Sequence, residues 1–138
     1  MGCNCGGIAV VVYTVGYSGR SVSELIALLK ENGVTTVVDV RRFPKSSDAD
    51  FNRENLERIL EGHGIKYIFL GESLGGFVRG GYEKYMETQR FKNGLNTLIE
   101  IARKEAVALL CKERNVKYCH RRFIAQRLES LGMEIKNL

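Results

Sequence analysis

Apolar residues along this chain form two alternating patterns, short, mostly apolar runs and stripes with helical spacing. The runs, typical of strands buried on both faces of a sheet, lie at 8–15, 35–40, 66–70 and 107–110. The stripes, in which apolar side chains recur every three or four residues, lie at 22–29, 52–61, 88–104 and 121–131. Residues 134–137 are a candidate fifth strand at an edge. This alternation predicts an α/β fold of three layers, a mostly parallel sheet of four or five strands with helices on both faces.

A glycine-rich stretch interrupts the alternation after the third strand. Residues 71–81 hold five glycines, and a short turn at 82–86 separates them from the next helical stripe. Long loops inside compact domains are commonly functional. We therefore expect this loop to contribute to a site.

The composition bounds the class of protein. A chain of 138 residues with 44% hydrophobic and 27% charged residues is long enough for one domain with its own core. We assign a single α/β domain to residues 8–138 and regard 1–7, which includes Cys3 and Cys5, as a flexible tail. The apolar run after this tail is too short for a secretory signal or a membrane span. We expect a cytoplasmic protein that does not enter membranes and whose thiols are reduced.

The chain is moderately basic, with a net charge of +5 and a pI of about 9.1. A basic excess favours an anionic partner, either a small molecule or nucleotide or else a nucleic acid. Surface Lys and Arg scattered without function would give the same total. The sequence identifies neither a cofactor nor an oligomeric state.

Polar and reactive residues follow most of the predicted strands directly. In parallel sheets, ligands bind beyond the carboxyl ends of the strands. We therefore predict that one cleft is lined by Ser18, Asp39, Arg41, Glu72, Cys111 and Cys119. This shared position is stronger evidence for a site than any single residue.

Two thiols and a histidine follow the fourth strand. Cys111 ends that strand, and Cys119 and His120 stand at the start of the last helical stripe. A helix N-terminus and the neighbouring Arg121 both favour a thiolate, so we predict a pKa for Cys119 about one unit or more below the reference value of about 8.5. Cys119 or Cys111 is then a candidate nucleophile or redox group, with His120 as acid or base. Buried structural cysteines and a redox disulfide remain alternatives.

The candidate substrate-binding residues are of three kinds. Arg41 and Arg121 are candidates for an anion clamp, although Arg41 and Asp39, two apart on one strand face, equally suit a salt bridge that orders the site. The turn after the first strand offers backbone N–H groups to an anion at a helix N-terminus. The other candidates for contacts with substrate are Asp39, the turn residues Gly16, Tyr17 and Ser18, and Glu72, Gly75 and Glu113.

A metal site is an alternative use of the same cluster. Cys111, Cys119 and His120 carry donor atoms that zinc and iron accept. Their spacing, Cys-x7-Cys-His, is not a familiar zinc pattern, and a fourth ligand would have to come from Glu72 or Glu113. The sequence therefore leaves metal binding open without predicting it.

Several of these pieces together resemble the family catalogued as domain of unknown function 488. The pieces that match, in family order from about residue 12 to 138, are Tyr13 to Ser18, Val38 to Arg41 with Pro44, Glu72 to Gly76, Tyr85 and Met86 with Phe91, Cys111 with Glu113, and Cys119 to Arg121. One departure is Tyr17, at a position where the family often has His. The resemblance implies a small intracellular α/β domain, and it implies no reaction.

These observations lead to one main reading and two alternatives. The main reading is an enzyme acting on an anionic small molecule or nucleotide through a cluster of Cys, His and Arg at the carboxyl ends of the strands. The first alternative is a nucleic-acid-associated binding module that uses the basic rim. The second is a zinc- or iron-binding protein.

Overall fold

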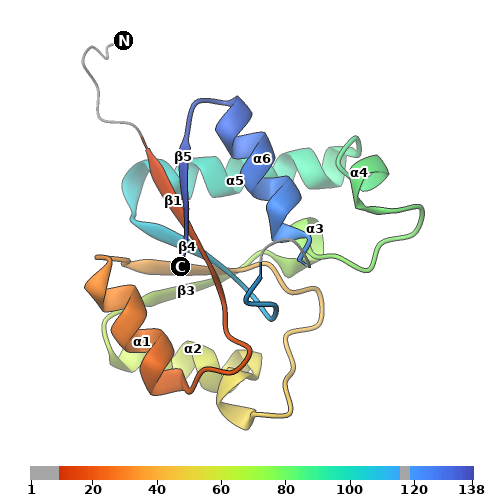
Figure 1. The fold of residues 1–138 in the computed structure, drawn as a ribbon. Coiled ribbons are helices and arrows are strands. Elements are labelled where there is room, and N and C mark those ends of the chain that lie inside the picture. The colour runs from red at the N-terminus through yellow and green to blue at the C-terminus, as the bar shows by residue number, and fades with distance from the viewer. Residues whose placement is uncertain (1–9, 116–118) are drawn as a thin grey trace.

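Five parallel strands form one sheet, with the strand order β3-β2-β4-β1-β5 (Figure 1). The computed structural model describes residues 10–115 and 119–138. Within them the strands are β1 (Val11–Gly16), β2 (Thr36–Asp39), β3 (Lys66–Phe69), β4 (Val107–Cys111) and β5 (Glu134–Asn137). Every pairing is parallel, so the predicted α/β fold with helices between the strands is confirmed, and the last strand does lie at an edge.

Helices connect the strands in the expected positions. The helical elements are α1 (Val22–Glu31), η1 (Ala49–Phe51), α2 (Arg53–Gly62), α3 (Gly71–Leu74), α4 (Tyr82–Tyr85), α5 (Gln89–Lys104) and α6 (Arg121–Ser130). α1 begins with a capping box, in which the Ser21 side chain accepts from the Glu24 N–H and the Glu24 carboxylate accepts from the Ser21 N–H. Among the helices of the described chain, none has the length and apolar composition to cross a membrane.

The structure differs from the sequence prediction in three places. The loop expected at 71–81 begins with a helical turn, α3, and the turn expected at 82–86 contains the short helix α4. The last long helix begins at Arg121, as predicted, but Cys119 precedes its first turn instead of lying within it. The predicted tail at 1–7, with Cys3 and Cys5, lies outside the described residues.

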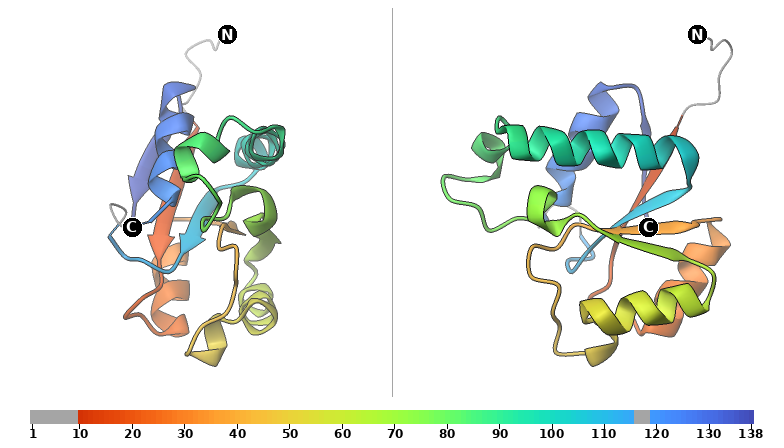
Figure 2. Two further views of the ribbon diagram at one scale, coloured as in Figure 1. Left: turned by 90° about the vertical axis from the view of Figure 1, so that its right-hand side faces the viewer. Right: turned by 180° about the vertical axis from the view of Figure 1, so that it is seen from behind.

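The two faces of the sheet have separate cores. One core joins Val15, Val37, Ala108 and Leu110 to α1 and α2, and the other joins Val12, Val38, Leu109 and Cys111 to α5 and α6. In Figure 1, α1 and α2 lie below the sheet and α5 and α6 above it, and Figure 2 shows the same layers from the side and from behind. Side chains of successive strand residues point to opposite faces, which explains why neighbours in sequence enter different cores.

The connections reverse direction next to β4. β1 leads through α1 to β2 and then through α2 to β3, moving toward one edge, whereas the connections after β3 and β4 return toward the other edge. Loops that leave neighbouring strands for opposite faces open a crevice at the carboxyl ends, where ligands bind in sheets of this kind. The fold therefore provides a crevice between the segments after β1, β2 and β4.

Candidate functional site

A cavity of about 420 Å³ lies at this reversal of direction. Residues after β1, β2 and β4 contribute to its lining, among them Tyr17, Arg41, Cys111, Glu113, Cys119 and His120. Of the residues expected to share a cleft, Arg41, Cys111 and Cys119 line this cavity, whereas Ser18, Asp39 and Glu72 do not. The cavity therefore brings together the thiols and the histidine, and it leaves part of the predicted set outside.

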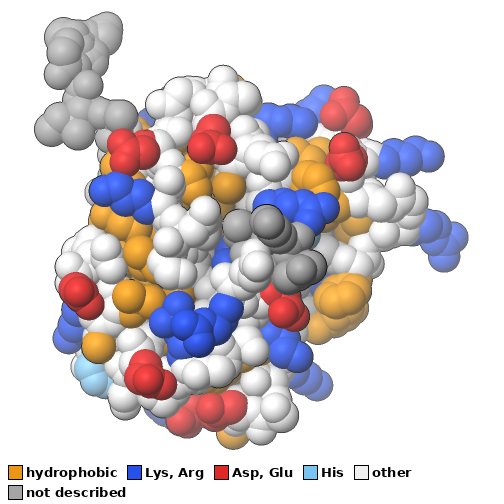
Figure 3. Space-filling model, viewed as in Figure 1, with side chains coloured by type: hydrophobic (Ala, Val, Ile, Leu, Met, Phe, Trp, Pro, Cys, Tyr) orange, Lys and Arg blue, Asp and Glu red, His pale blue; other side chains and the backbone are white. Residues whose placement is uncertain are grey.

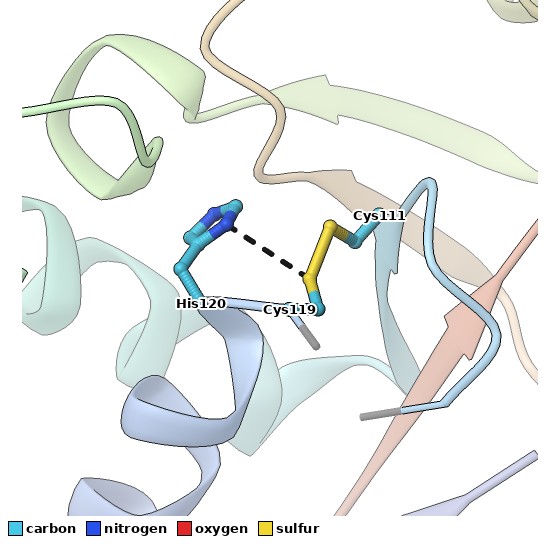
Figure 4. Close-up of side chains that lie close together, drawn as sticks. All are labelled: Cys111, Cys119 and His120. Atoms are coloured by element: carbon cyan, nitrogen blue, oxygen red, sulfur yellow. Dashed lines mark hydrogen bonds between the residues drawn. A yellow bond between two sulfur atoms is a disulfide. The ribbon is translucent and has the colours of Figure 1, made fainter. Parts of the chain in front are cut away.

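Cys111 and Cys119 are joined by a disulfide bond, and His120 lies beside it (Figure 4). Both cysteines are nearly buried, with exposed fractions of 6% and 4%, but both line the cavity. Sγ of Cys119 accepts from the backbone N–H of Arg121, at 3.5 Å, which is the first residue of α6. The start of the helix thus faces the sulfur, as the sequence indicates, although the cysteine itself is not helical.

The ring of His120 has a defined tautomer. Its Nε2 lies 2.8 Å from the carbonyl oxygen of Val40, and since a carbonyl oxygen only accepts, Nε2 must carry the proton. In the neutral ring, Nδ1 is then the acceptor. Nδ1 lies 3.9 Å from Sγ of Cys119, so the lone pair of the imidazole faces the sulfur.

The surroundings of His120 keep it neutral near pH 7. Burial lowers the pKa of His120 below its usual value, the hydrogen bond to Val40 opposes this in part, and the guanidinium groups of Arg121 and Arg42 lower it further. The ring packs against Tyr82 at a centroid distance of 5.3 Å. Gly76 lies on the ring as well, since a Cβ at that position would be 3.1 Å from Nδ1.

Asp39 and Arg41 form a buried ion pair on the other face of the sheet. Asp39 is fully buried, and its two carboxylate oxygens accept from Nε and Nη2 of Arg41 at 2.9 and 2.7 Å. The Tyr67 hydroxyl donates to the same carboxylate, and Nη1 of Arg41 donates to the carbonyl of Phe51. Although burial alone would lower the pKa of Arg41, its bonds to Asp39 raise it. This network orders the chain after β2, so the salt-bridge alternative for the pair is the one observed.

Arg121 ties the segment after β4 to α6 and does not face the cavity. It is fully buried, and its guanidinium donates to the backbone carbonyls of Glu113 and Arg114. Burial lowers the pKa of Arg121 to about 10, so the group remains a cation at neutral pH. Its bonds to main-chain carbonyls give it a positioning role in the segment that carries the cysteines, in place of the expected anion clamp.

The turn after β1 is not a free anion site. The N–H groups of Tyr17 and Ser18 donate to the carbonyls of Cys111 and Lys112, at 3.1 and 2.9 Å, and extend the β1–β4 pairing. Gly16 is needed for close packing, because a Cβ there would overlap the backbone of Glu113 and Arg114. The N–H groups expected to bind an anion therefore hold the segment after β4 in place.

The glycine-rich segment after β3 approaches the site through its backbone. Glu72 is exposed on α3, away from the cavity lining. Gly75 packs against the backbone of Arg42, whose Nε and Nη2 donate to the carbonyls of Gly76 and Gly75. Neither Glu72 nor Gly75 contacts the cavity, but Gly76 does.

Comparison with known proteins gives one match. The sequence profile of the family described as domain of unknown function DUF488 matches residues 21–128. The chain belongs to this family. No curated protein and no solved structure shows significant similarity. The DUF488 match covers most of the chain and includes Cys111, Cys119 and His120. The segment from Tyr13 to Ser18, which also resembles the family, lies before the matched residues.

Sequence reasoning missed part of the cavity of this DUF488 domain. Lining residues not proposed as site residues are Phe43, Lys45, Gly76, Phe77 and Lys112. The available signal was the unusual placement of Phe43 and Phe77 in polar, glycine-rich or proline-containing loops. Large apolar side chains in such loops are poor candidates for a core, which favours a role at the surface.

Gly16→Ala should lower the stability of the protein. The added Cβ would overlap the carbonyl of Glu113, and relieving such overpacking typically costs about 1–3 kcal/mol. Thermal unfolding followed by circular dichroism measures the effect. Gly62→Ala is the matched control, because that residue ends α2 and a Cβ there meets nothing within 4 Å. Equal melting temperatures for the two variants would contradict the packing role of Gly16.

Proposed function

We propose that this protein is a thiol-dependent enzyme that acts on an anionic small molecule, with Cys119 as the reactive sulfur and His120 as its acid and base. The observation that carries the proposal is the pairing of Cys119 with the unprotonated Nδ1 of His120, at 3.9 Å, inside a cavity. A nucleophile within reach of a base that a third group orients is the arrangement that activates thiols in enzymes. Here the orienting group is the carbonyl of Val40.

The chemistry of the reduced site follows from the histidine tautomer. The Cys119 thiol gives its proton to Nδ1 of His120, and the thiolate that results is stabilised by the N–H of Arg121. The sulfur bonds to an electrophilic atom of the substrate while the bond to the leaving group breaks. The leaving group departs with the proton that His120 releases. His120 thus acts first as base and then as acid.

Cys111 gives the site a second, oxidised state. Loss of two electrons and two protons from the two thiols to an oxidant such as a small-molecule disulfide yields the Cys111–Cys119 bond that the structure contains. In that state the sulfur of Cys119 cannot attack. A thiol reductant restores the dithiol, so activity requires reducing conditions, which fit the cytosolic location that we propose.

The charges of the cavity support an anionic substrate. Arg42, Lys45 and Lys112 line it together with one acidic side chain, that of Glu113. Arg41 also lines the cavity, although its charge is balanced by Asp39. An excess of cations in a recess raises the local concentration of anions. In the space-filling view, Lys and Arg side chains lie both near the centre of this face of the molecule and along its edges (Figure 3).

His120→Gln should slow alkylation of Cys119 in the reduced protein. His120 takes the proton of the thiol as the sulfur reacts, so its loss should slow alkylation by about 10-fold or more at pH 7. The measurement is the pH dependence of iodoacetamide modification, followed by peptide mass spectrometry so that each cysteine is read separately. In the unsubstituted protein, half-reaction of Cys119 is expected below about pH 8.5.

The matched control is His63→Gln. His63 is the other histidine of the chain, and it lies exposed at the end of α2, where Nδ1 contacts the carbonyl of Ile59. Its substitution should leave the Cys119 profile unchanged. A half-reaction point at or above about pH 8.5, or the same profile in the His120 and His63 variants, would remove the nucleophile from the proposal.

Metal binding is a second candidate function, and two observations favour it. Cys111, Cys119 and His120 each offer one ligand atom, and these atoms lie within 4.8 Å of one another. His120 also donates its Nε2 proton to a backbone carbonyl, which is the usual second contact of a metal-bound histidine. Three such ligands beside a cavity resemble a catalytic zinc site with an open fourth position. The disulfide excludes this use, so only the reduced protein is competent.

Metal content of the reduced protein tests this candidate. If the cluster is a metal site, protein purified under reducing conditions with zinc should hold close to one equivalent by elemental analysis, and Cys111→Ser should lose it. Replacing Cys3 and Cys5 by Ser together is the control, and it should retain the zinc. Reduced, folded protein that binds no zinc would eliminate the candidate and leave the thiol chemistry as the remaining use of the cluster.

A further inference from the structure

Two exposed phenylalanines stand at the edge of the cavity that holds Cys119 and His120. Phe43 is 66% exposed and Phe77 is 91% exposed. Both line the cavity, and their ring centroids are 6.0 Å apart, although one follows β2 and the other lies between α3 and α4. A single exposed apolar side chain needs no explanation, but two in contact at the edge of one cavity form a surface for an apolar or aromatic group.

The position of Phe77 is fixed by its backbone. Its φ of 58° lies in the left-handed region, which is rare for a bulky side chain and tends to mark functional sites. The preceding residue, Gly76, is held by the guanidinium of Arg42, whose Nε donates to the Gly76 carbonyl at 2.6 Å. Gly76 also packs on the ring of His120. Phe77 therefore directly follows Gly76, the residue that contacts His120, the proposed acid and base.

Cations share this edge with the phenylalanines. Lys45 and Lys112 are exposed and line the same cavity. Among the described residues, no carboxylate forms an ion pair with either of them. Their ammonium groups are thus available to an anionic group of a ligand. An aromatic surface and unpaired cations at one cavity are complementary to a ligand that has both a flat ring and a negative charge.

We propose that the cavity binds a mononucleotide, with its base stacked on Phe77 and its phosphate held by Lys45 and Lys112. The proposal rests on the proposed function, because it names the substrate class of the same cavity. A base inserted between Phe43 and Phe77 would need about 7 Å, twice the contact distance of about 3.5 Å, and the rings are 6.0 Å apart. The base therefore stacks on the exposed face of Phe77. The cavity of about 420 Å³ falls within the range of small-molecule sites, about 300–1,000 Å³.

Calorimetric titration of the reduced, full-length protein separates the two parts of the ligand. The probes are adenosine 5′-monophosphate, adenosine, ribose 5-phosphate and inorganic phosphate, each at low and high salt. Adenosine 5′-monophosphate should bind at least about 10-fold more tightly than any of the others, since stacking of a base on an aromatic side chain is worth about that factor or more. Its affinity should fall as salt screens the lysines.

Two variants assign the contacts to residues. Phe77→Ala should weaken binding of adenosine 5′-monophosphate by about 10-fold and leave binding of ribose 5-phosphate unaffected. Lys112→Ala should weaken binding of adenosine 5′-monophosphate and of ribose 5-phosphate and leave binding of adenosine unaffected. Leu131→Ala is the control, because Leu131 is another exposed large apolar residue, with an exposed fraction of 56%, and it does not line this cavity. Phe77 is a surface residue, so the folded state of its variant can be verified by its melting temperature.

Alkylation of Cys119 links this ligand to the thiol and separates the two proposals. Saturating adenosine 5′-monophosphate should protect Cys119 from iodoacetamide, and at one fixed, lower nucleotide concentration Phe77→Ala should be protected less than Leu131→Ala. Equal affinities for adenosine 5′-monophosphate and ribose 5-phosphate, or binding without protection of Cys119, would overturn the nucleotide proposal and leave the thiol result intact. A single-stranded oligonucleotide that binds over about 100-fold more tightly than the mononucleotide would overturn it in favour of nucleic-acid binding.

Discussion

The hydrogen bond from Nε2 of His120 to the carbonyl of Val40 is the interaction on which the site depends. It fixes the proton on the nitrogen that faces the sheet, and it leaves Nδ1 as an acceptor 3.9 Å from Sγ of Cys119. Without it, the ring could rotate or change tautomer, and the thiol would lose its base. The aromatic ring of Tyr82 and the backbone of Gly76 confine the imidazole from its other sides.

The buried ion pair on the opposite face supports that hydrogen bond from a distance. In the sequence, Val40 lies between Asp39 and Arg41, the two members of this ion pair, at the end of β2. Removing one member of a buried pair typically destabilises a protein by about 3–5 kcal/mol, so this pair holds this part of the chain in place. The Val40 carbonyl is thereby presented to α6, and a structural ion pair on one face positions a candidate catalytic group on the other.

Much of the fold was predictable because it depends on local patterns. The apolar runs and helical stripes identified the strands and the long helices, and the position of Cys111, Cys119 and His120 after the fourth strand predicted that these three residues lie close together. The contacts of Asp39 were harder to assign, because the side of the sheet on which its side chain lies depends on the register between β2 and β4, in which Asp39 pairs with Leu110. The role of Val40 was not predictable at all, since a backbone carbonyl has no sequence signature. The pairing of Phe43 with Phe77 likewise depends on two loops that meet only in the folded chain.

The tautomer of His120 is the most direct test of this account. Long-range proton–nitrogen NMR correlations of the imidazole rings report which nitrogen carries the proton, and Gln in place of His63 leaves His120 as the only histidine to observe. For the reduced protein at neutral pH, we expect an uncharged ring with its proton on Nε2. A ring protonated on Nδ1, or on both nitrogens, would contradict it, because Nδ1 would then have no lone pair to accept the proton of the Cys119 thiol.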